Sequence, residues 1–234
     1  MRTERTTLGK DNAMKKYSLL IISLINAAIT AIIIALSPRK LVPSHWGIEG
    51  YADDFSSKWI LMMLPAIPLA IGLGWYLFEL FMEKSYTARE NDKVAFKIVA
   101  AIFGLFMAIA WFFLFVSLND MRELGEKTAF LSLMLMGVLI IYISNLMPKV
   151  KQNSVLGIRT TATLKNETVW RKTHKFAGYM GVISGGIIIV FGIMCFFIEA
   201  NPLLLLMIGC GIAIVLFSIV PCIYASVLYK KLTK

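Results

Sequence analysis

Long runs of apolar residues alternate with short polar segments along the chain. A transmembrane helix needs about 20 residues to cross a hydrocarbon core about 30 Å thick. Six runs reach this length, and they are Tyr17–Leu36, Trp59–Phe81, Ile98–Leu118, Thr128–Met147, Phe176–Ile198 and Pro202–Tyr229. The pattern therefore predicts an all-α, polytopic membrane protein with six transmembrane helices. Prolines inside the second and the last run predict that these two helices bend.

The composition excludes an ordinary soluble domain. Hydrophobic residues make up 58% of the chain and charged residues 16%, against about 25% charged residues in typical soluble domains. We interpret the formal net charge of +10 as contact with anionic lipid headgroups and not with nucleic acid. Cys195, Cys210 and Cys222 all lie inside apolar runs, so we expect buried, free thiols and no disulfide framework.

Lysine and arginine are unevenly divided between alternate loops, and this bias predicts the orientation of the helices. Of the 24 such residues, 19 lie in the N-terminal tail, in the second and fourth connecting segments or at the C-terminal end. The other loops carry the remaining 5. The bias predicts that both termini lie in the cytoplasm. The first apolar run is too long for the core of a cleaved signal peptide, so we expect a retained signal anchor.

We expect three segments along the chain. Residues 1–16 form a cytoplasmic tail, and residues 17–96 form a two-helix unit whose outer loop spans residues 37–58. Residues 97–234 form a four-helix unit whose inner loop spans residues 148–175. The two named loops are longer and richer in polar and aromatic residues than the others, so we look there for function.

The outer loop should be a compact, irregular turn structure, because Pro43, Gly47 and Gly50 break helices and strands. Aromatic residues interleave with its charges, which is typical of interfacial anchoring but also suits docking of an apolar peptide. Imidazole and carboxylates suit several divalent ions, but the spacing repeats no known ligand pattern, so we expect no metal and no cofactor. The outer candidate site comprises His45, Trp46, Glu49, Asp53 and Asp54.

The inner loop begins where Pro148 ends the fourth helix, and Gly157 with Thr160–Thr163 suggests a turn. Asn166 is a favourable helix N-cap, so Glu167–Lys175 should form a short, basic, amphipathic helix. On this helix Trp170 and His174 share a face, and we expect a structural role for the histidine. The helix either rests on anionic lipid or docks a cytoplasmic protein. The candidate partner site comprises Asn153, Gly157, Arg159, Thr160, Asn166, Trp170, Arg171 and His174.

The apolar runs contain few chemically informative residues. Small residues let helices approach closely in lipid, so the fifth helix should pack centrally through Gly178, Gly181, Gly185 and Gly186. Asn26 and Asn145 are candidates for hydrogen bonds between helices. The predicted midplanes carry no charged residue or histidine, which argues against an ion-coupled pump. We find no catalytic motif, so we do not expect an enzyme.

Both long loops resemble the SdpI family of bacterial immunity proteins. In the inner loop the resemblance rests on Met147-Pro148, Asn153, GIRTTATL at Gly157–Leu164 and NETVWRKTHKFAG at Asn166–Gly178. In the outer loop it rests on Pro43, His45, Gly50 and Ser57-Lys58-Trp59, which are similar to a small domain that commonly precedes the family's core. This sequence departs from the pattern at Thr161-Ala162, where the family often has Pro-Trp, and at Gly47, where the family tends to have a polar residue.

The resemblance implies a non-enzymatic, multi-pass protein of the bacterial cell membrane. Its implied role is protection against a secreted, membrane-active peptide toxin. It also implies a sensor role, in which the protein recruits a soluble transcriptional repressor. Two alternatives stay open. One is a small-solute transporter or exporter with a cavity lined by Asn26, Ser144 and Asn145, and the other is a membrane enzyme that uses His45 with Glu49 or Asp53.

Overall fold

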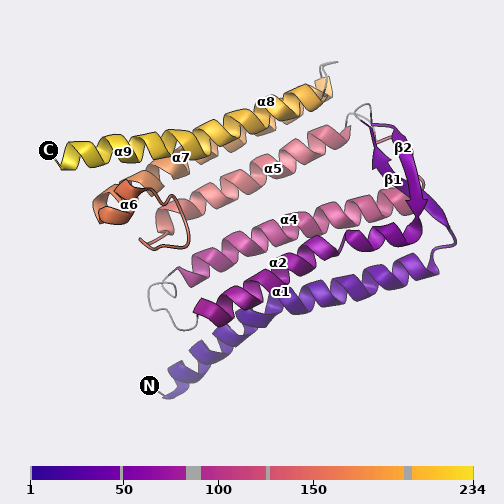
Figure 1. Ribbon diagram of the computed structural model, residues 1–234, viewed down its shortest axis with the longest axis horizontal. Coiled ribbons are helices and arrows are strands. Elements are labelled where there is room, and N and C mark those ends of the chain that lie inside the picture. Colours follow the sequence, from indigo (N-terminus) through magenta and orange to yellow (C-terminus); the bar gives the residue numbers. More distant parts are fainter. Residues whose placement is uncertain (1, 48–49, 83–90, 125–126, 198–201, 234) are drawn as a thin grey trace. The chain divides into compact units, whose positions relative to one another are not determined.

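The computed structural model describes residues 2–47, 50–82, 91–124, 127–197 and 202–233 (Figure 1). The longer helices are α1 (Arg2–Leu36), α2 (Ala66–Met82), α4 (Asp92–Leu118), α5 (Lys127–Leu146), α7 (Glu167–Phe197), α8 (Pro202–Ile214) and α9 (Val220–Leu232). The shorter elements are strands β1 (Leu41–Trp46) and β2 (Ala52–Ser57), the 3₁₀ helices η1 (Lys58–Met63) and η2 (Met147–Lys149), helix α6 (Thr161–Lys165) and the π-helix η3 (Val215–Ile219).

The prediction of six transmembrane helices is confirmed. The described residues contain six helices that are long and apolar enough to cross a membrane. They are Lys15–Leu36, Lys58–Phe81, Asp92–Leu118, Phe130–Lys149, Glu167–Met194 and Met207–Leu232. The polar segment before the first span is not separate from it, because α1 already begins at Arg2. The side of the membrane on which each terminus lies stays a prediction.

The chain divides into two compact units. The N-terminal unit comprises Met1–Ser85 and Val99–Leu124, and the C-terminal unit comprises Tyr86–Ile98 and Gly125–Lys234. Most of α4 therefore groups with α1 and α2, whereas the boundary drawn from the sequence put this helix with the C-terminal helices. A pattern of apolar runs gives the number of spans but carries no information about which spans pack together.

In the N-terminal unit α1 packs closely against α2 through a glycine. A Cβ atom at Gly72 would lie 2.8 Å from both the Leu19 carbonyl oxygen and the Ser23 hydroxyl oxygen, so only a glycine permits this approach. An indole donor also bridges α1 and α4, because Trp111 Nε1 donates to Asn26 Oδ1 over 2.9 Å. This bond confirms the expected role of Asn26 between helices.

The first loop is more regular than the sequence predicted, because β1 and β2 form an antiparallel hairpin (Figure 1). Gly47 and Gly50 lie in the connection between the strands, where Gly50 adopts a φ of 80°. Pro43 lies within β1, next to register shifts that mark bulges. Val42 anchors the hairpin in an apolar cluster with Ile34, Leu61 and Leu114. The residues that we read as strand breakers therefore define the turn and the bulges of a hairpin.

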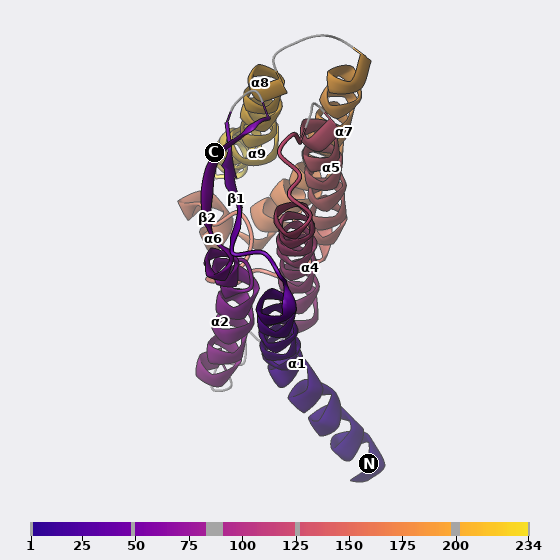
Figure 2. The ribbon, with the colours of Figure 1, turned by 90° about the vertical axis from the view of Figure 1, so that its right-hand side faces the viewer.

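In the C-terminal unit α5 runs alongside α7 (Figure 2). A Cβ atom at Gly185 would lie 2.6 Å from Ile141 Cγ1 and 2.7 Å from the Gly137 carbonyl oxygen. Gly178 and Gly181 also meet Ser144 of α5. The close helix approach expected of these three glycines is confirmed, but Gly186 was wrongly included, since a Cβ there would meet nothing within 4 Å.

The last span contains the irregularity that its proline predicted. The π-helix η3 immediately precedes Val220 and Pro221, at the start of α9. A proline has no N–H to donate and its ring crowds the carbonyl four residues earlier, so the helix must change its hydrogen-bonding pattern here. The nearby thiols of Cys210 and Cys222 are free as expected but only partly buried, and the side chain of Cys195 lies outside the described residues.

We predict that Gly185→Leu destabilises the protein by about 1–3 kcal/mol, the usual cost of overpacking a close contact. Gly186→Leu is the matched control, since it adds the same side chain one residue away in open space. The midpoint of unfolding in a denaturing detergent titration should fall for Gly185→Leu and stay unchanged for Gly186→Leu. Equal midpoints for the two variants would contradict the proposed α5–α7 contact.

Candidate functional site

The hairpin brings together three of the five residues predicted for the outer site. His45 Nδ1 lies 2.6 Å from Asp53 Oδ1, and both side chains are more than half exposed. Asp54 Oδ2 accepts a hydrogen bond of 3.0 Å from the Ser44 hydroxyl, which also lies 3.0 Å from the Ser56 hydroxyl. Each carboxylate thus contacts one partner on the other strand and stays exposed. Glu49 lies outside the described residues, and among the residues that are described no three His, Cys, Asp or Glu side chains gather as metal ligands.

Trp46 connects the hairpin to a segment that sequence reasoning overlooked, residues 119–124. Its Nε1 donates to the Met121 carbonyl oxygen over 3.1 Å. Two backbone bonds extend this contact: the Ala52 N–H donates to the Arg122 oxygen over 2.7 Å, and the Leu124 N–H donates to the Gly50 oxygen over 2.9 Å. The first and third loops therefore meet at one end of the N-terminal unit. No local pattern in the sequence signals this pairing.

Charged side chains hold residues 119–124 in place. Asp120, which adopts a φ of 55°, lies 3.3 Å from Arg39 and 3.4 Å from Arg122. A hydrogen bond from Arg122, together with the charges of both guanidinium groups, holds the pKa of the Asp120 carboxyl below its usual value. Arg39 also donates to the Leu118 carbonyl oxygen at the end of α4 over 2.8 Å. The segment is tied to the chain just after α1.

Lys58 fastens the other end of the hairpin to α1. Its Nζ donates to the Ala35 carbonyl oxygen over 3.0 Å and to the Ser37 carbonyl oxygen over 2.7 Å. These carbonyls lie at the C-terminal end of α1, where cations are favourable. Lys58 is one of the residues that carried the family resemblance, and its role here is to position the hairpin.

The second long loop, residues 148–175, is built around a buried aromatic pair. The Trp170 and His174 rings stack with centroids 4.1 Å apart, and at most 1% of either residue is exposed. Trp170 Nε1 donates to the Val150 carbonyl oxygen over 2.8 Å. Their shared face and the structural role of the histidine agree with expectation, but the helix does not present this face to lipid or to a partner.

His174 fixes the backbone of the loop with both ring nitrogens. The Ile158 N–H donates to Nε2 over 3.0 Å, and Nδ1 lies 2.9 Å from the Trp170 carbonyl oxygen. An acceptor at Nε2 and a carbonyl beside Nδ1 together require a neutral ring with its proton on Nδ1. Gly157 makes this close approach feasible, since its φ of 106° suits glycine and any Cβ would collide with the His174 ring.

Asn153 and Thr160 organise the remaining backbone of the loop. Asn153 Oδ1 accepts from the N–H groups of Val155 and Leu156, each over 2.7 Å, and Nδ2 donates to the Lys151 oxygen over 2.7 Å. Thr160 begins a reciprocal capping box with Thr163. The predicted turn at residues 160–163 is therefore wrong, since this cap starts the short helix α6. Asn166 is confirmed as the N-cap of α7, accepting from the Val169 N–H over 3.0 Å.

The basic side chains of the loop lie outside this buried frame. Arg159, Lys165, Arg171, Lys172 and Lys175 are all exposed. Arg159 also donates from Nη1 to the Ser154 carbonyl oxygen over 2.7 Å. The predicted partner site thus separates into two sets: Asn153, Gly157, Thr160, Asn166, Trp170 and His174 shape the loop, whereas Arg159 and Arg171 present charge.

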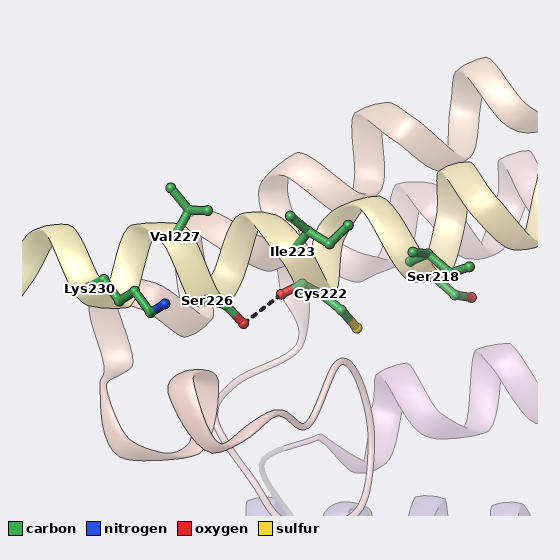
Figure 3. Close-up of a pocket in the computed structure, with 7 residues that line it drawn as sticks. Ser218, Cys222, Ile223, Ser226, Val227 and Lys230 are labelled. Carbon is green, nitrogen blue, oxygen red and sulfur yellow. Dashed lines mark hydrogen bonds between the residues drawn. The ribbon is translucent and has the colours of Figure 1, made fainter.

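A shallow groove of about 470 Å³ lies along η3 and α9 (Figure 3). It is lined by Ser218, Ile219, Cys222, Ile223, Ser226, Val227 and Lys230. The Ser226 hydroxyl donates within the helix to the Cys222 carbonyl oxygen over 3.1 Å, so it is not directed at a ligand. The residues expected to line a transport cavity are not among these, and Ser144 and Asn145 bond to carbonyls of their own helix.

We predict that Gly157→Ala destabilises the loop by about 1–3 kcal/mol, because alanine is strained at this φ and its Cβ meets the His174 ring. Hydrogen exchange of residues 153–165 should accelerate. Adding His174→Ala removes the collision but not the backbone strain, so the double variant should lose less than the sum of the single losses. Strictly additive losses would show that the glycine and the histidine do not act together.

Two comparisons with known proteins find similarity over a range that includes the second loop. Residues 149–224 match the model of the SdpI/YfhL protein family, a range that holds most of the loop frame. The curated protein "Immunity protein SdpI" of Bacillus subtilis (strain 168) is 26% identical over 222 residues, which cover 93% of this chain and 97% of that protein. No solved structure matches. The family match over residues 149–224 and the near full-length relative confirm the resemblance to the SdpI family, and the chain is a multi-pass membrane protein.

Proposed function

We propose that the chain is an immunity protein that protects a bacterium from a secreted, membrane-active peptide toxin. The observation that carries this proposal is the similarity to an immunity protein over nearly the whole length of both chains. A similarity of that extent includes the hairpin as well as the loop of residues 148–175. We propose that the protein acts by binding and not by catalysis.

The hairpin is the surface that we assign to the toxin. Tyr51, Phe55 and Trp59 are exposed there, beside the carboxylates of Asp53 and Asp54. Aromatic side chains beside charged groups can contact an apolar peptide at a hydrated surface. This assignment requires the hairpin to lie on the outer side, as the distribution of lysine and arginine predicts.

The exposed basic residues of the second loop suit a soluble cytoplasmic partner. We propose that this surface recruits a transcriptional repressor when toxin is bound, through charge complementarity with an acidic face of that protein. Anionic headgroups compete for the same residues when no partner is present. Coupling between toxin and repressor requires that the two ligands favour the same conformation of the protein.

We predict the sidedness as follows. In intact cells, a membrane-impermeant thiol reagent should label a cysteine introduced by Asp54→Cys and leave one introduced by Lys165→Cys unlabelled. Both positions are exposed in the structure. A difference in labelling between them therefore reports the side of the membrane on which each position lies. Permeabilised cells are the control, and there both cysteines should react. The reverse labelling pattern in intact cells would refute the assignment of the two loops.

We predict that expression of the chain raises the toxin concentration needed to kill a sensitive strain, tested with a panel of purified membrane-active peptides. The exchange of Arg171 and Lys172 for glutamate should keep this protection, since both are exposed, but abolish the transcriptional response to toxin. The matched control exchanges Arg171→Lys and Lys172→Arg and should keep both activities. Absence of protection against every peptide would refute the immunity function, and an intact response in the glutamate variant would refute recruitment by this surface.

A further inference from the structure

The outer edge of β2 offers unpaired backbone groups. The Lys58 N–H donates to the Lys40 oxygen across the hairpin over 3.0 Å. In an antiparallel pair the backbone groups of successive residues point alternately toward the partner strand and away from it. Ser57 and Phe55 therefore direct their N–H and carbonyl groups away from β1. Within the described part of the hairpin, Asp53, Asp54, Phe55 and Ser57 are all exposed.

The edge of β1 is less suited to a further strand. Val42 and Pro43 are buried, and proline has no N–H to donate. Proline on an edge strand is one of the usual means of preventing unwanted pairing. The outer edge of β1 is therefore closed to a further strand, whereas the outer edge of β2 is open.

Residues 122–124 already pair with the open edge near the start of β2. The Tyr51 carbonyl oxygen accepts a hydrogen bond of 2.8 Å from the Gly47 N–H, so the backbone groups of Tyr51 point into the hairpin. The backbone groups of the next residue, Ala52, therefore point away from β1. Ala52 and Gly50 bond there to Arg122 and Leu124. A bulge after Ala52 changes which residues of β2 point their backbone groups toward β1. As a result, the backbone groups of Phe55 and Ser57 also point away from β1. Residues 122–124 thus occupy the first part of this edge. The Arg122 guanidinium lies 5.2 Å from the centroid of the Phe55 ring, but the backbone of Phe55 and Ser57 remains open.

We propose that the open edge of β2 binds an extended segment of the membrane-active peptide by adding it as a further antiparallel strand. This inference rests on the proposed function and specifies how the toxin is recognised. Backbone hydrogen bonds supply affinity in this mode, and alternate side chains supply specificity. The pairing of residues 122–124 on the same edge is the intramolecular precedent.

The side chains beside the edge indicate the chemistry of the segment. Phe55 and Leu41 are exposed apolar residues of the hairpin, whereas Asp53 and Asp54 are exposed carboxylates. Successive side chains of a strand point to opposite faces. A segment in which apolar and basic residues alternate would place its apolar side chains by the aromatic ring and its basic side chains by the carboxylates.

Ser57 permits a sharp test. Its φ of −55° is close to the value that proline requires, so Ser57→Pro removes one outward N–H with little strain on the hairpin. Ser57→Ala removes the hydroxyl and keeps the N–H, which makes it the matched control. One strand hydrogen bond corresponds to roughly a fivefold change in affinity.

The direct experiment uses the full chain in lipid nanodiscs and a short synthetic peptide of alternating leucine and lysine as the probe. We expect the probe to bind wild-type protein and Ser57→Ala alike, and Ser57→Pro about fivefold more weakly. A copy of the probe with N-methyl groups at alternate residues should bind wild-type protein at least as weakly, which tests the edge without any change in the protein. Equal binding of both probes, or no binding at all, would overturn the proposal.

The protection assay separates this inference from the proposed function. If wild-type protein protects cells and Ser57→Pro protects them only up to a toxin concentration about fivefold lower, both stand. If both proteins protect equally, immunity stands and the strand-addition mode is refuted, whereas absence of protection by wild-type protein refutes the immunity function itself. A dimer of wild-type protein that Ser57→Pro dissociates would show that the edge binds a second copy, and would also overturn the proposal.

Discussion

Backbone polar groups inside a membrane protein must find partners within the protein, because the hydrocarbon offers none, and large polar side chains usually do the same. The large aromatic residues of this chain show the constraint most clearly. Trp75 donates to the Lys15 carbonyl oxygen and Trp111 to Asn26, each within the N-terminal unit. Trp170 donates to the Val150 carbonyl oxygen. Each indole therefore joins two segments that are distant in sequence, and the packing of the helices depends on these bonds.

Burial imposes a related constraint on residues 150–160, which form no helix or strand but carry several buried or partly buried backbone groups. A loop with few ladder bonds must satisfy its backbone through side chains. Asn153, Thr160, Thr163 and His174 do this, and Gly157 admits the histidine ring. A frame held in this way is sensitive to small changes. Its exposed basic residues lie outside this frame, so the structure separates the residues that build the loop from those available to a partner.

The sequence predicted the features that depend on composition over about 20 residues. Of the features that depend on contacts, it predicted the bond of Asn26 and the close packing of Gly178, Gly181 and Gly185 but missed those of the hairpin. The six spans follow from apolar length alone. The N-cap at Asn166 and the tight turn at Gly157 were also predictable, since each has a local cause. Gly47 and Gly50 were interpreted as breakers of structure, because a glycine in a turn and a glycine in an irregular loop look alike in sequence. The pairing of Ala52 with Arg122 joins residues far apart in the chain, and no local pattern encodes it.

The hairpin also follows from the requirement that polar groups be satisfied. A strand edge with free N–H and carbonyl groups cannot face hydrocarbon, so the open part of β2 must stand in the wet interface. Exposed edges invite pairing with other chains, and proteins usually block them with proline, charge or bulges. Here Pro43 blocks one edge, residues 122–124 cover part of the other, and the bulge ends that coverage before Phe55. Among the described residues the stretch around Phe55 and Ser57 is the part of the β2 edge that these devices leave open, and we interpret it as a binding surface and not as a residual defect of folding.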